Sequence, residues 1–454
     1  MTEPKVPDNS DVLSMRQWIT HLDKTGRLST TKMGVPLNFT LAAISKKLDG
    51  RQATLFPKPD GHETSVVSGI VSKREWIAEA IGVKEDQLLK RFRDAVNNPI
   101  PWREIKNAPA QDVQCTENID LNHLLPIPVH NEHDNGKYIT AGLVIARNPQ
   151  TGDQNVSINR LQVSGKDRLG ILILPRDLHK FFDMAEKTGT DLSVAIAIGV
   201  DPITLLASQA IVPTNTDELM VAGGLMKQPL KVVKCLTNDV RVPADSEVII
   251  EGRLLANLRE MEGPFGEFPQ YYGPAGERQV IQIDAVSTQR NPIYHTIVPA
   301  AMEHLLLGAI PREASLLAIL QRQFSNVKDV HLSRGGVCRY HLLIQIYFHL
   351  KFLRWLLLNH HDIDLPVVHS DQCYFLIYRW KFLRGLHYFL IHVSMFHGKE
   401  DEVVPVSFSK KVLSIFKRAK KKLIIIKKGD HSLSDTKSLK MIKRELSIII
   451  KNVS

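Results

Sequence analysis

The segment VIQIDAV at residues 280–286 indicates the fold class, because its apolar and polar side chains alternate. Ile281, Ile283 and Ala285 share one face of an extended chain, and this period of two is typical of a half-buried β-strand. A second segment, VAIAI at residues 194–198, is an apolar run closed by Gly199. Such a short run is typical of a strand that is buried on both faces. Residues 116–310 are therefore predicted to form a strand-rich domain.

Amphipathic helices precede and interrupt this strand-rich region. Residues 18–22 predict an early helix, and residues 78–95 predict two helices broken at Gly82-Val83. Short strand signals also occur in this region, so residues 1–115 are expected to form an N-terminal α/β domain. Within the strand-rich region, one helix is predicted from apolar residues at i, i+3, i+4 and i+7, namely Leu178, Phe181, Phe182 and Ala185.

The pattern changes again in the last third of the chain. After Pro311, an apolar face predicts a helix with this proline near its first turn, carried by Leu316, Leu317, Leu320 and Phe324. Residues 346–392 are rich in large apolar side chains but follow no clean period. Regular patterns return in 393–454, where residues 423–426 predict a buried strand between two amphipathic helices. The order of helices and strands predicts an α+β protein.

The charge of the chain lies mainly in its tail. There are 58 Lys and Arg against 48 Asp and Glu, a net charge of +10. Residues 406–454 hold 14 basic and 3 acidic residues, which leaves 44 basic and 45 acidic residues in 1–405. The basic residues of the tail alternate with apolar stripes, as in KKLIIIKK at 421–428. This pattern favours solvated faces over a nucleic-acid-binding patch.

Several other protein classes are disfavoured by what the sequence lacks. No uncharged run reaches the ~20 residues of a membrane span, and the N-terminus MTEPKVPDNSDVLS has no apolar signal-peptide core. The four cysteines are far apart and form no CxxC, unlike those of a disulfide scaffold or a zinc finger. Motifs of phosphate-binding loops, zincins and nucleophile elbows are also missing. We expect a soluble, cytoplasmic protein.

Paired carboxylates make EGPFGE at residues 262–267 the first candidate for chemistry. Glu262 and Glu267 flank a Gly-Pro-x-Gly turn, which could present both to one cavity. A carboxylate paired with a guanidinium stays ionised, whereas a carboxyl in an apolar pocket can keep a proton to donate. The alternative is two surface glutamates on an ordinary turn, and spacing alone favours that alternative.

Two further clusters of polar residues remain open to more than one interpretation. In NVSINR at 155–160, alternate side chains of an extended strand place Asn155, Ser157 and Asn159 on one face. Their oxygens suit a hard cation or a phosphate, but a polar-faced edge strand has the same pattern. In HNEHDNG at 130–136, His130, His133 and Asp134 could bind a metal, but Asn135-Gly136 is a strong turn signal, and we favour the turn.

Long blocks of the sequence resemble the UbiD family of decarboxylases, which use prenylated FMN. The resemblance covers residues from about 10 to 345 and is carried by NVSINRLQVSGKDRLGILILPRD (155–177), SVAIAIGVDP (193–202), LKVVKCLTNDVRVPADSEVIIEG (230–252), EGPFGEFPQYYGP (262–274) and HLSRGGVCRYHLLIQI (331–346). It implies an α+β protein whose middle domain is a split β-barrel, like that of flavin reductases, next to the N-terminal α/β domain. Residues 311–345 then begin a C-terminal domain.

The resemblance also implies roles for the clusters already described. The catalytic Glu-Arg-Glu triad of the family falls on Arg160, Glu262 and Glu267, with Glu267 as proton donor. A manganese ion that bridges to the flavin phosphate would be held by Asn155, Asp177 and Glu218, and K⁺ is a further expected ion. The implied flavin-binding residues are Asn155, Ser157, Ile158, Asn159, Arg160, Arg176, Gln209 and Glu218.

The chain departs from the family pattern at two places. The family usually has histidine at the metal position taken here by Asp177, and His179 is about 200° further around a helix, so it is a poor substitute. Beyond residue 345 the C-terminal domain of the family is not recognisable. Residues 393–454 instead resemble the end of an α/β-hydrolase, with Asp401 and His431 where that family has its triad acid and histidine. We interpret 346–392 as a junction and 393–454 as a non-family α/β fragment.

The leading hypothesis is a lyase for reversible, non-oxidative decarboxylation of an aromatic, phenolic or α,β-unsaturated acid. It would use prenylated FMN, a divalent metal such as Mn²⁺, and K⁺. One alternative is an inactive, truncated flavin-binding remnant, and another is a serine-type hydrolase defined by the tail, which lacks a nucleophile elbow. The expected partners are the small acid substrate, a flavin prenyltransferase that supplies the cofactor, and further copies of the chain in a homo-oligomer. No nucleic acid and no membrane span are expected.

Overall fold

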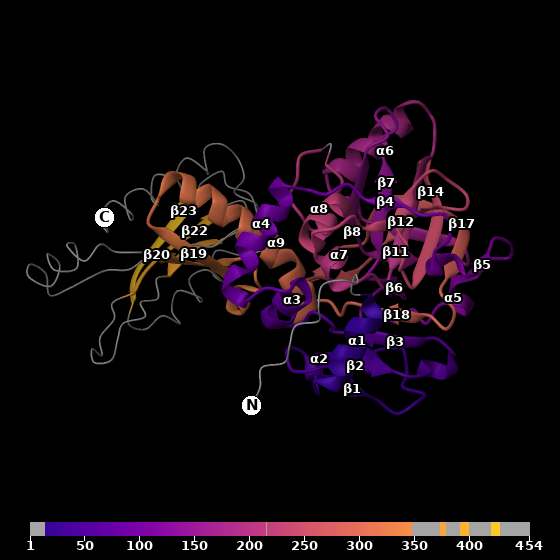
Figure 1. Ribbon diagram of the computed structural model, residues 1–454, viewed down its shortest axis with the longest axis horizontal. Coiled ribbons are helices and arrows are strands. Elements are labelled where there is room, and N and C mark those ends of the chain that lie inside the picture. Colours follow the sequence, from indigo (N-terminus) through magenta and orange to yellow (C-terminus); the bar gives the residue numbers. More distant parts are fainter. Residues whose placement is uncertain (1–13, 215, 347–372, 378–390, 399–418, 427–454) are drawn as a thin grey trace, which may run out of the picture. The chain divides into compact units, whose positions relative to one another are not determined.

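The computed structural model describes residues 14–214, 216–346, 373–377, 391–398 and 419–426. The chain divides into two units, Met1–Pro311 and Arg312–Ser454. Helices and β-sheets both occur in the described chain, with long runs of strands between the helices (Figure 1), which confirms the predicted α+β class. Whether residues 1–115 and 116–310 are separate domains stays a prediction.

A nine-stranded sheet forms the centre of the first unit. Its strands are β5 (Val113–Cys115), β6 (Tyr138–Ile139), β7 (Leu143–Arg147), β8 (Gln154–Ile158), β9 (Leu161–Val163), β10 (Arg168–Ile171), β11 (Leu192–Ile198), β14 (Val248–Glu262) and β17 (Gly276–Thr288). They are ordered β6-β9-β10-β17-β14-β11-β7-β8, and β5 pairs with β17. The sheet is antiparallel at each of these pairings. The split-barrel form of this sheet stays a prediction.

The two segments that indicated the fold class lie in the middle of this sheet. VIQIDAV belongs to β17, where Ile281, Ile283 and Ala285 are buried and the intervening Gln282 and Asp284 are partly exposed. The apolar run at 194–198 belongs to β11, which lies between β14 and β7 and is almost entirely buried. Alternation therefore predicted a half-buried strand, and the continuous apolar run predicted a central one, as the structure confirms.

A β-bulge between β14 and β17 depends on a glycine. The register shifts between Glu251 and Gly252, and a Cβ atom on Gly252 would lie 2.2 Å from the Gln282 carbonyl oxygen. Because this contact is with backbone, the strands would have to separate. We expect Gly252→Ala to lower the free energy of unfolding by about 3 kcal/mol, measured by urea denaturation. Gly165→Ala is the control, because its Cβ would make only an ordinary 3.5 Å contact with Arg168, and its expected effect is below about 0.5 kcal/mol.

Helices and smaller sheets surround the central sheet. The predicted N-terminal helices are α1 (Met15–Lys24), α3 (Arg74–Ile81) and α4 (Leu88–Asn97), with Gly82 as the left-handed C-cap of α3. The remaining helices of this part include α2 (Thr40–Leu48), α5 (Leu121–Leu124), α7 (Pro202–Ala207) and α8 (Glu218–Met226). The predicted apolar face at 178–185 lies on α6 (Asp177–Lys187) and is buried against β7, β8, β11 and β14.

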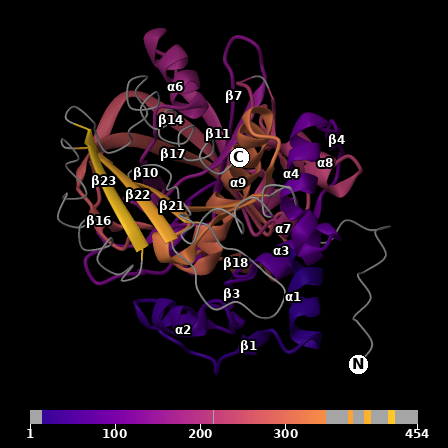
Figure 2. The ribbon, with the colours of Figure 1, turned by 90° about the vertical axis from the view of Figure 1, so that its left-hand side faces the viewer.

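Two small sheets combine strands from distant parts of the first unit. One contains β1 (Leu28–Thr30), β2 (Ala53–Phe56), β3 (Ser65–Ser68) and β18 (Ile293–His295), and the other contains β4 (Arg103–Glu104), β12 (Lys231–Lys234) and β13 (Arg241–Pro243). In Figures 1 and 2, β1–β3 lie with α2 at the end of the unit opposite α6. One hydrophobic core joins residues of the small sheet, such as Phe56 and Val66, to the central sheet.

The helix predicted to start at Pro311 begins earlier than expected, so this boundary was wrong. Helix α9 spans Met302–Gln323, and Pro311 lies in its interior. Proline removes one backbone hydrogen bond from a helix interior and usually ends or kinks it. Here Ile310 and Ala314 on either side of the proline are buried, so packing of the apolar face outweighs the local preference.

The described strands of the second unit form one five-stranded sheet. They are β19 (Val327–Leu332), β20 (His341–Ile346), β21 (Cys373–Ile377), β22 (Ile391–Gly398) and β23 (Ala419–Ile426), in this order. The predicted strand at 423–426 is therefore confirmed as the end of β23, and 346–392, which followed no clean period, contains β21. The helix predicted over 408–419 lies outside the described residues except for Ala419, which begins β23 instead of ending a helix, so this boundary was wrong. The final predicted helix, Asp401 and His431 lie outside the described residues.

Candidate active site

Three charged side chains that are distant in the sequence meet at one point of the first unit. Arg160 lies between β8 and β9, and Glu262 is the last residue of β14. The Arg160 Nη2 atom donates to Glu262 Oε2 at 2.8 Å, and Nη1 donates to Glu267 Oε1. One guanidinium therefore joins both carboxylates of the EGPFGE segment. Gly170 on β10 lies beside this pair, since a Cβ there would make an ordinary 3.4 Å contact with Glu262 Cγ.

The three side chains differ in their access to solvent. Glu262 is fully buried and Arg160 is 9% exposed, whereas the Glu267 side chain is 31% exposed. Burial disfavours the charged form of Arg160, but the two carboxylates outweigh burial and raise the pKa of the guanidinium. Within the described residues, Arg160 Nε and Glu262 Oε1 are buried without a hydrogen-bond partner. The site thus keeps buried polar atoms that a bound molecule could satisfy.

A short hairpin carries Glu267. Strands β15 (Phe265–Gly266) and β16 (Tyr272–Gly273) pair antiparallel, and the Glu267 N–H donates to the Tyr271 carbonyl oxygen at 2.8 Å. The Phe265 ring lies under the site, with its centroid 5.4 Å from Arg160 Cζ and 4.3 Å from the Tyr138 ring centroid. The hairpin therefore carries both the Glu267 carboxylate and the Phe265 ring that packs against Arg160 and Tyr138.

Two residues of this site were missed by the sequence analysis. Gln162 Oε1 accepts from the Tyr138 hydroxyl at 3.1 Å and from the Gly263 N–H at 2.9 Å. Burial, and then the nearby charge of Glu262, raise the pKa of Tyr138 far above its ordinary value. The spacing of Arg160 and Gln162 could have indicated Gln162, because alternate residues of an extended chain share a face. The position of Tyr138 carried no such signal.

Two of the three predicted metal ligands are in direct contact. Asn155 Nδ2 donates to Glu218 Oε1 at 3.0 Å, and the Val156 N–H donates to Glu218 Oε2 at 2.7 Å. Glu218 is 4% exposed, and burial raises its pKa to about 8, with a smaller contribution from the Asp217 and Asp177 carboxylates. A buried carboxylate with two acidic neighbours is an environment that a bound cation would stabilise.

Asp177 is close enough to act on Glu218, but it has other partners. It is the first residue of α6, and its Oδ1 atom accepts from Lys180 Nζ at 2.8 Å and from Thr214 Oγ1 at 3.0 Å. No group of three His, Cys, Asp or Glu side chains suited to a metal occurs among the described residues. The predicted set has only two carboxylates, and its third member is the Asn155 amide. Its use as a metal site therefore stays a prediction.

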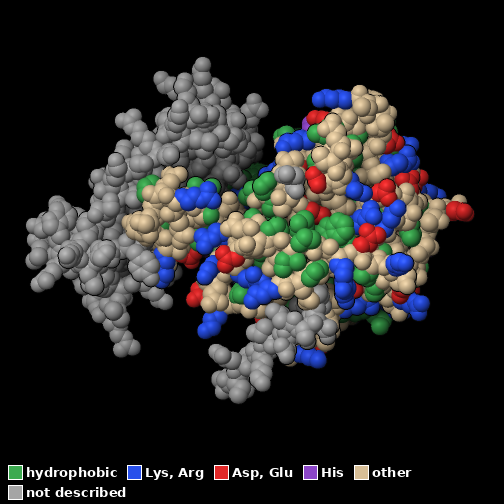
Figure 3. Space-filling view, turned by 45° about the horizontal axis from the view of Figure 1, so that its top comes forward, with side chains coloured by type: hydrophobic (Ala, Val, Ile, Leu, Met, Phe, Trp, Pro, Cys, Tyr) green, Lys and Arg blue, Asp and Glu red, His purple; other side chains and the backbone are tan. Residues whose placement is uncertain are grey.

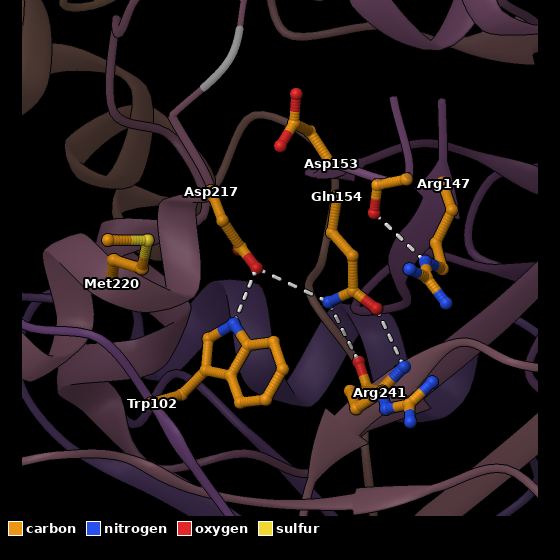
Figure 4. A pocket seen from close by; sticks show the side chains of 8 residues that line it. Trp102, Arg147, Asp153, Gln154, Asp217, Met220 and Arg241 are labelled. Carbon is orange, nitrogen blue, oxygen red and sulfur yellow. Dashed lines mark hydrogen bonds between the residues drawn. The ribbon is translucent and has the colours of Figure 1, made fainter. Parts of the chain in front are cut away.

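A pocket of about 300 Å³ is lined by Gln154 and Asp217, the residues directly before Asn155 and Glu218 in the sequence, and by Trp102. Asp217 caps α8 by accepting from the Leu219 N–H at 2.8 Å. It also accepts from Trp102 Nε1 at 2.9 Å and from Gln154 Nε2 at 3.3 Å (Figure 4). Gln154 and Asn155 are consecutive on β8 and point to opposite faces. Side chains from both faces of β8 therefore contact the first residues of α8, and these contacts fix the position of Glu218.

The other residues expected to bind flavin lie on or directly after β8, or next to the helices α6 and α7. Ser157 Oγ donates to Asn159 Oδ1 at 2.8 Å, and Asn159 Nδ2 donates to the Leu172 carbonyl oxygen at 3.2 Å. The other expected residues are Ile158 at the end of β8, exposed Arg176 directly before α6, and half-buried Gln209 after α7. The flavin-binding roles of these residues stay predictions.

The histidine cluster at 130–136 adopts a turn, the interpretation that the sequence favoured. His130 is fully buried, its Nε2 atom lies 2.8 Å from Thr296 Oγ1, and burial lowers its pKa to about 3. His133 is exposed. The turn is followed by β6, which pairs with β9. Asp134 contacts the hairpin that carries Glu267.

Comparisons with known proteins identify the family. Residues 19–96 match the 3-octaprenyl-4-hydroxybenzoate carboxy-lyase N-terminal domain, and residues 103–302 match the Rift-related domain of the same enzymes. An anhydromevalonate phosphate decarboxylase from Methanothermobacter thermautotrophicus is 35% identical over 326 residues, which cover 72% of this chain and 76% of the relative. A phenolic acid decarboxylase from Bacillus subtilis is 32% identical, over 64% of this chain and 63% of the relative.

Solved structures agree with these relatives. The UbiD-class enzyme HmfF from Pelotomaculum thermopropionicum, in an evolved dimeric form in complex with prFMN, has a TM-score of 0.73 and 49% identity, and the match covers 74% of this chain and 80% of HmfF. HmfF in complex with FMN has a TM-score of 0.73 and 41% identity, over 88% of this chain and 85% of HmfF. Fold and site therefore define an enzyme of the decarboxylase class. The chain belongs to the UbiD family.

The surface and the helices show two further features. On the face drawn in Figure 3, basic and acidic side chains of the described residues are interspersed rather than gathered by sign. Among the described helices, none combines the length and the apolar character that crossing a membrane requires. The non-family origin of 393–454 stays a prediction.

Proposed function

We propose that this enzyme catalyses the reversible, non-oxidative decarboxylation of an aromatic, phenolic or α,β-unsaturated acid, with prenylated FMN and a divalent metal such as Mn²⁺. The observation that carries the proposal is the single guanidinium of Arg160 bound to both Glu262 and Glu267. The decarboxylases among its relatives support the reaction, and the prFMN complex of HmfF supports the cofactor.

The residues present suit such a cofactor. The buried Glu218 carboxylate and the Asn155 amide offer oxygen ligands of the kind that hard cations prefer. Asn155, Asp177 and Glu218 would hold the metal, with K⁺ as a second cation, and the flavin would lie along Ser157, Ile158, Asn159, Arg176 and Gln209. Prenylated FMN supplies, when bound, the electron sink for the carbon that loses CO₂, which no side chain supplies well.

The unequal burial of the three charged residues suggests a separate catalytic role for each. Fully buried Glu262 orients Arg160, whose guanidinium binds the carboxylate of the substrate through its planar N–H groups. Glu267, whose side chain is the more exposed of the two glutamates, is the residue that would protonate the carbon that has lost CO₂. The chain thus contributes substrate orientation and a proton.

The test is to purify the enzyme after co-expression with a flavin prenyltransferase, the expected supplier of the cofactor. We expect bound modified flavin in the absorbance spectrum and CO₂ release from a phenolic acid or from an unsaturated aliphatic acid. A colourless protein that releases no CO₂ would favour the inactive remnant. Size-exclusion chromatography with light scattering tests the expected homo-oligomer, which the dimeric form of HmfF supports.

The role of Asp177 in metal binding can be tested on its own. We expect Asp177→Ala to weaken Mn²⁺ binding at least about tenfold, measured by calorimetry on protein without flavin, because one of three ligands is lost. Asp183→Ala is a matched control: Asp183 lies on the same helix and pairs with His179 at 3.1 Å, yet it belongs to no proposed site. Equal Mn²⁺ affinity in wild type and Asp177→Ala would exclude Asp177 as a ligand.

A further inference from the structure

The turn at residues 131–135 is bonded to the hairpin that carries Glu267. The Gly266 N–H donates to Asp134 Oδ1 at 2.8 Å, and the Asn135 N–H donates to the Pro264 carbonyl oxygen at 2.9 Å. The second oxygen of Asp134, Oδ2, accepts from the Asn131 N–H at 2.8 Å. Asp134 thus uses both oxygens, one to close its own turn and one to hold the hairpin.

The two segments approach each other as closely as a glycine allows. A Cβ atom on Gly266 would lie 2.5 Å from Asn131 Nδ2 and 3.5 Å from Asp134 Oδ1. Further along the hairpin, the Tyr272 hydroxyl accepts from the His133 N–H at 3.1 Å. The contact therefore extends from the first strand of the hairpin to the second.

Asp134 is well placed to act on the site without belonging to the charged cluster. It is 8% exposed, and the residue that it holds, Gly266, directly precedes Glu267. Burial raises the pKa of Asp134, and the N–H groups of Gly266 and Asn131 and the charge of Arg160 oppose that effect. A carboxylate buried at this cost is best explained by the two backbone N–H groups that it satisfies.

We propose that Asp134 is a positioning residue, which fixes the Gly266 backbone and thereby places the Glu267 carboxyl against Arg160. This inference rests on the proposed function for the role of Glu267, but the contact itself does not depend on it. An error of about 1 Å in the position of a reacting group can cost about 100-fold in rate, so loss of this contact should affect turnover more than binding.

The test compares Asp134→Ala and Asp134→Asn with Asp120→Ala as the matched control. Asp120 also accepts a backbone N–H two residues on, that of Asn122, at the start of α5. In Asp134→Asn the side chain keeps one acceptor oxygen. The NH₂ group that replaces the other oxygen cannot accept a hydrogen bond from the second backbone N–H. The measurements are amide hydrogen exchange of residues 263–276 without cofactor, FMN affinity, and kcat and KM.

For Asp134→Ala we expect amide exchange in 263–276 to rise about tenfold and kcat to fall about 10- to 100-fold. KM and FMN affinity should change less than about twofold, because the carboxylate-binding and metal-binding groups remain. Asp134→Asn should show an intermediate effect on exchange and kcat, and Asp120→Ala should show neither.

Unchanged exchange in both Asp134 variants would overturn the contact, and faster exchange with unchanged kcat would overturn the positioning role. If Asp134→Ala does not fold, Asp134→Asn carries both measurements. A wild-type enzyme that binds modified flavin but releases no CO₂ would refute the proposed function instead, and the exchange data would still decide whether Asp134 holds the hairpin.

Discussion

Glu267→Gln is expected to lower kcat about 10³-fold while FMN binding stays at the wild-type level. Glutamine keeps the size of the side chain and an oxygen that can accept from Arg160, but it cannot donate an acidic proton. General acid catalysis typically contributes about 10²- to 10⁴-fold, and the loss should fall in this range. The measurement is CO₂ release under saturating substrate, with bound flavin quantified by absorbance in the same preparation.

Glu260→Gln provides a close control for this experiment. Glu260 also pairs with an arginine, Arg168 at 2.9 Å, and its side chain is 32% exposed, almost the same as the 31% of Glu267. It lies two residues before Glu262 but outside the charged cluster. We expect kcat of Glu260→Gln to stay near that of wild type. Wild-type turnover in Glu267→Gln would remove Glu267 from the role of proton donor.

Arg160→Met is expected to abolish turnover and to destabilise the fold. The substitution leaves the fully buried Glu262 without its guanidinium partner, and breaking a buried ion pair in this way typically costs about 3–5 kcal/mol. Turnover should be lost because no guanidinium remains to bind the substrate carboxylate. Urea denaturation measures the first effect, and CO₂ release measures the second.

The double variant Arg160→Met/Glu262→Gln separates the two effects. Removing the unpaired charge should recover most of the lost free energy of unfolding, but it should not restore turnover. Arg168→Met is the control for an ordinary ion pair, because Arg168 and Glu260 at 2.9 Å are joined by a single hydrogen bond and are both partly exposed, and such pairs contribute about 0–1 kcal/mol. A stable, active Arg160→Met variant would contradict the proposed role of the pair.

Two central strands of the first unit, β11 and β17, and the helices α1, α3, α4 and α6 could be predicted because their patterns are local. The alternation at 280–286 and the apolar run at 194–198 both reflect which faces of a strand are buried. The start of α9 could not be predicted in the same way. Pro311 is a local signal for the first turn of a helix, but the packing of its neighbours extends the helix nine residues further back. Burial is a property of the whole fold.

Only part of the candidate site could be predicted, because its contacts also depend on the folded chain. Resemblance to the family indicated Arg160, Glu262 and Glu267, and the structure brings them together. Spacing alone had favoured two surface glutamates on an ordinary turn, because it contains no information on Arg160, about a hundred residues earlier. Tyr138, Gln162 and Asp134 contact the site or its hairpin through the folded chain. The contacts of Tyr138 and Asp134 are not apparent from their immediate neighbours in the sequence, whereas the spacing from Arg160 could have indicated Gln162.

By itself, the sequence determined the α+β class, the central strands of the large sheet and, through its long motif blocks, the UbiD family. Only the tertiary structure decided that one guanidinium joins two carboxylates of unequal burial, that both faces of β8 hold the start of α8, and that the turn at 131–135 holds the hairpin of Glu267. The physical reason is that periodicity records burial along one segment. The distance and exposure of charged groups depend instead on segments that meet only in the folded chain.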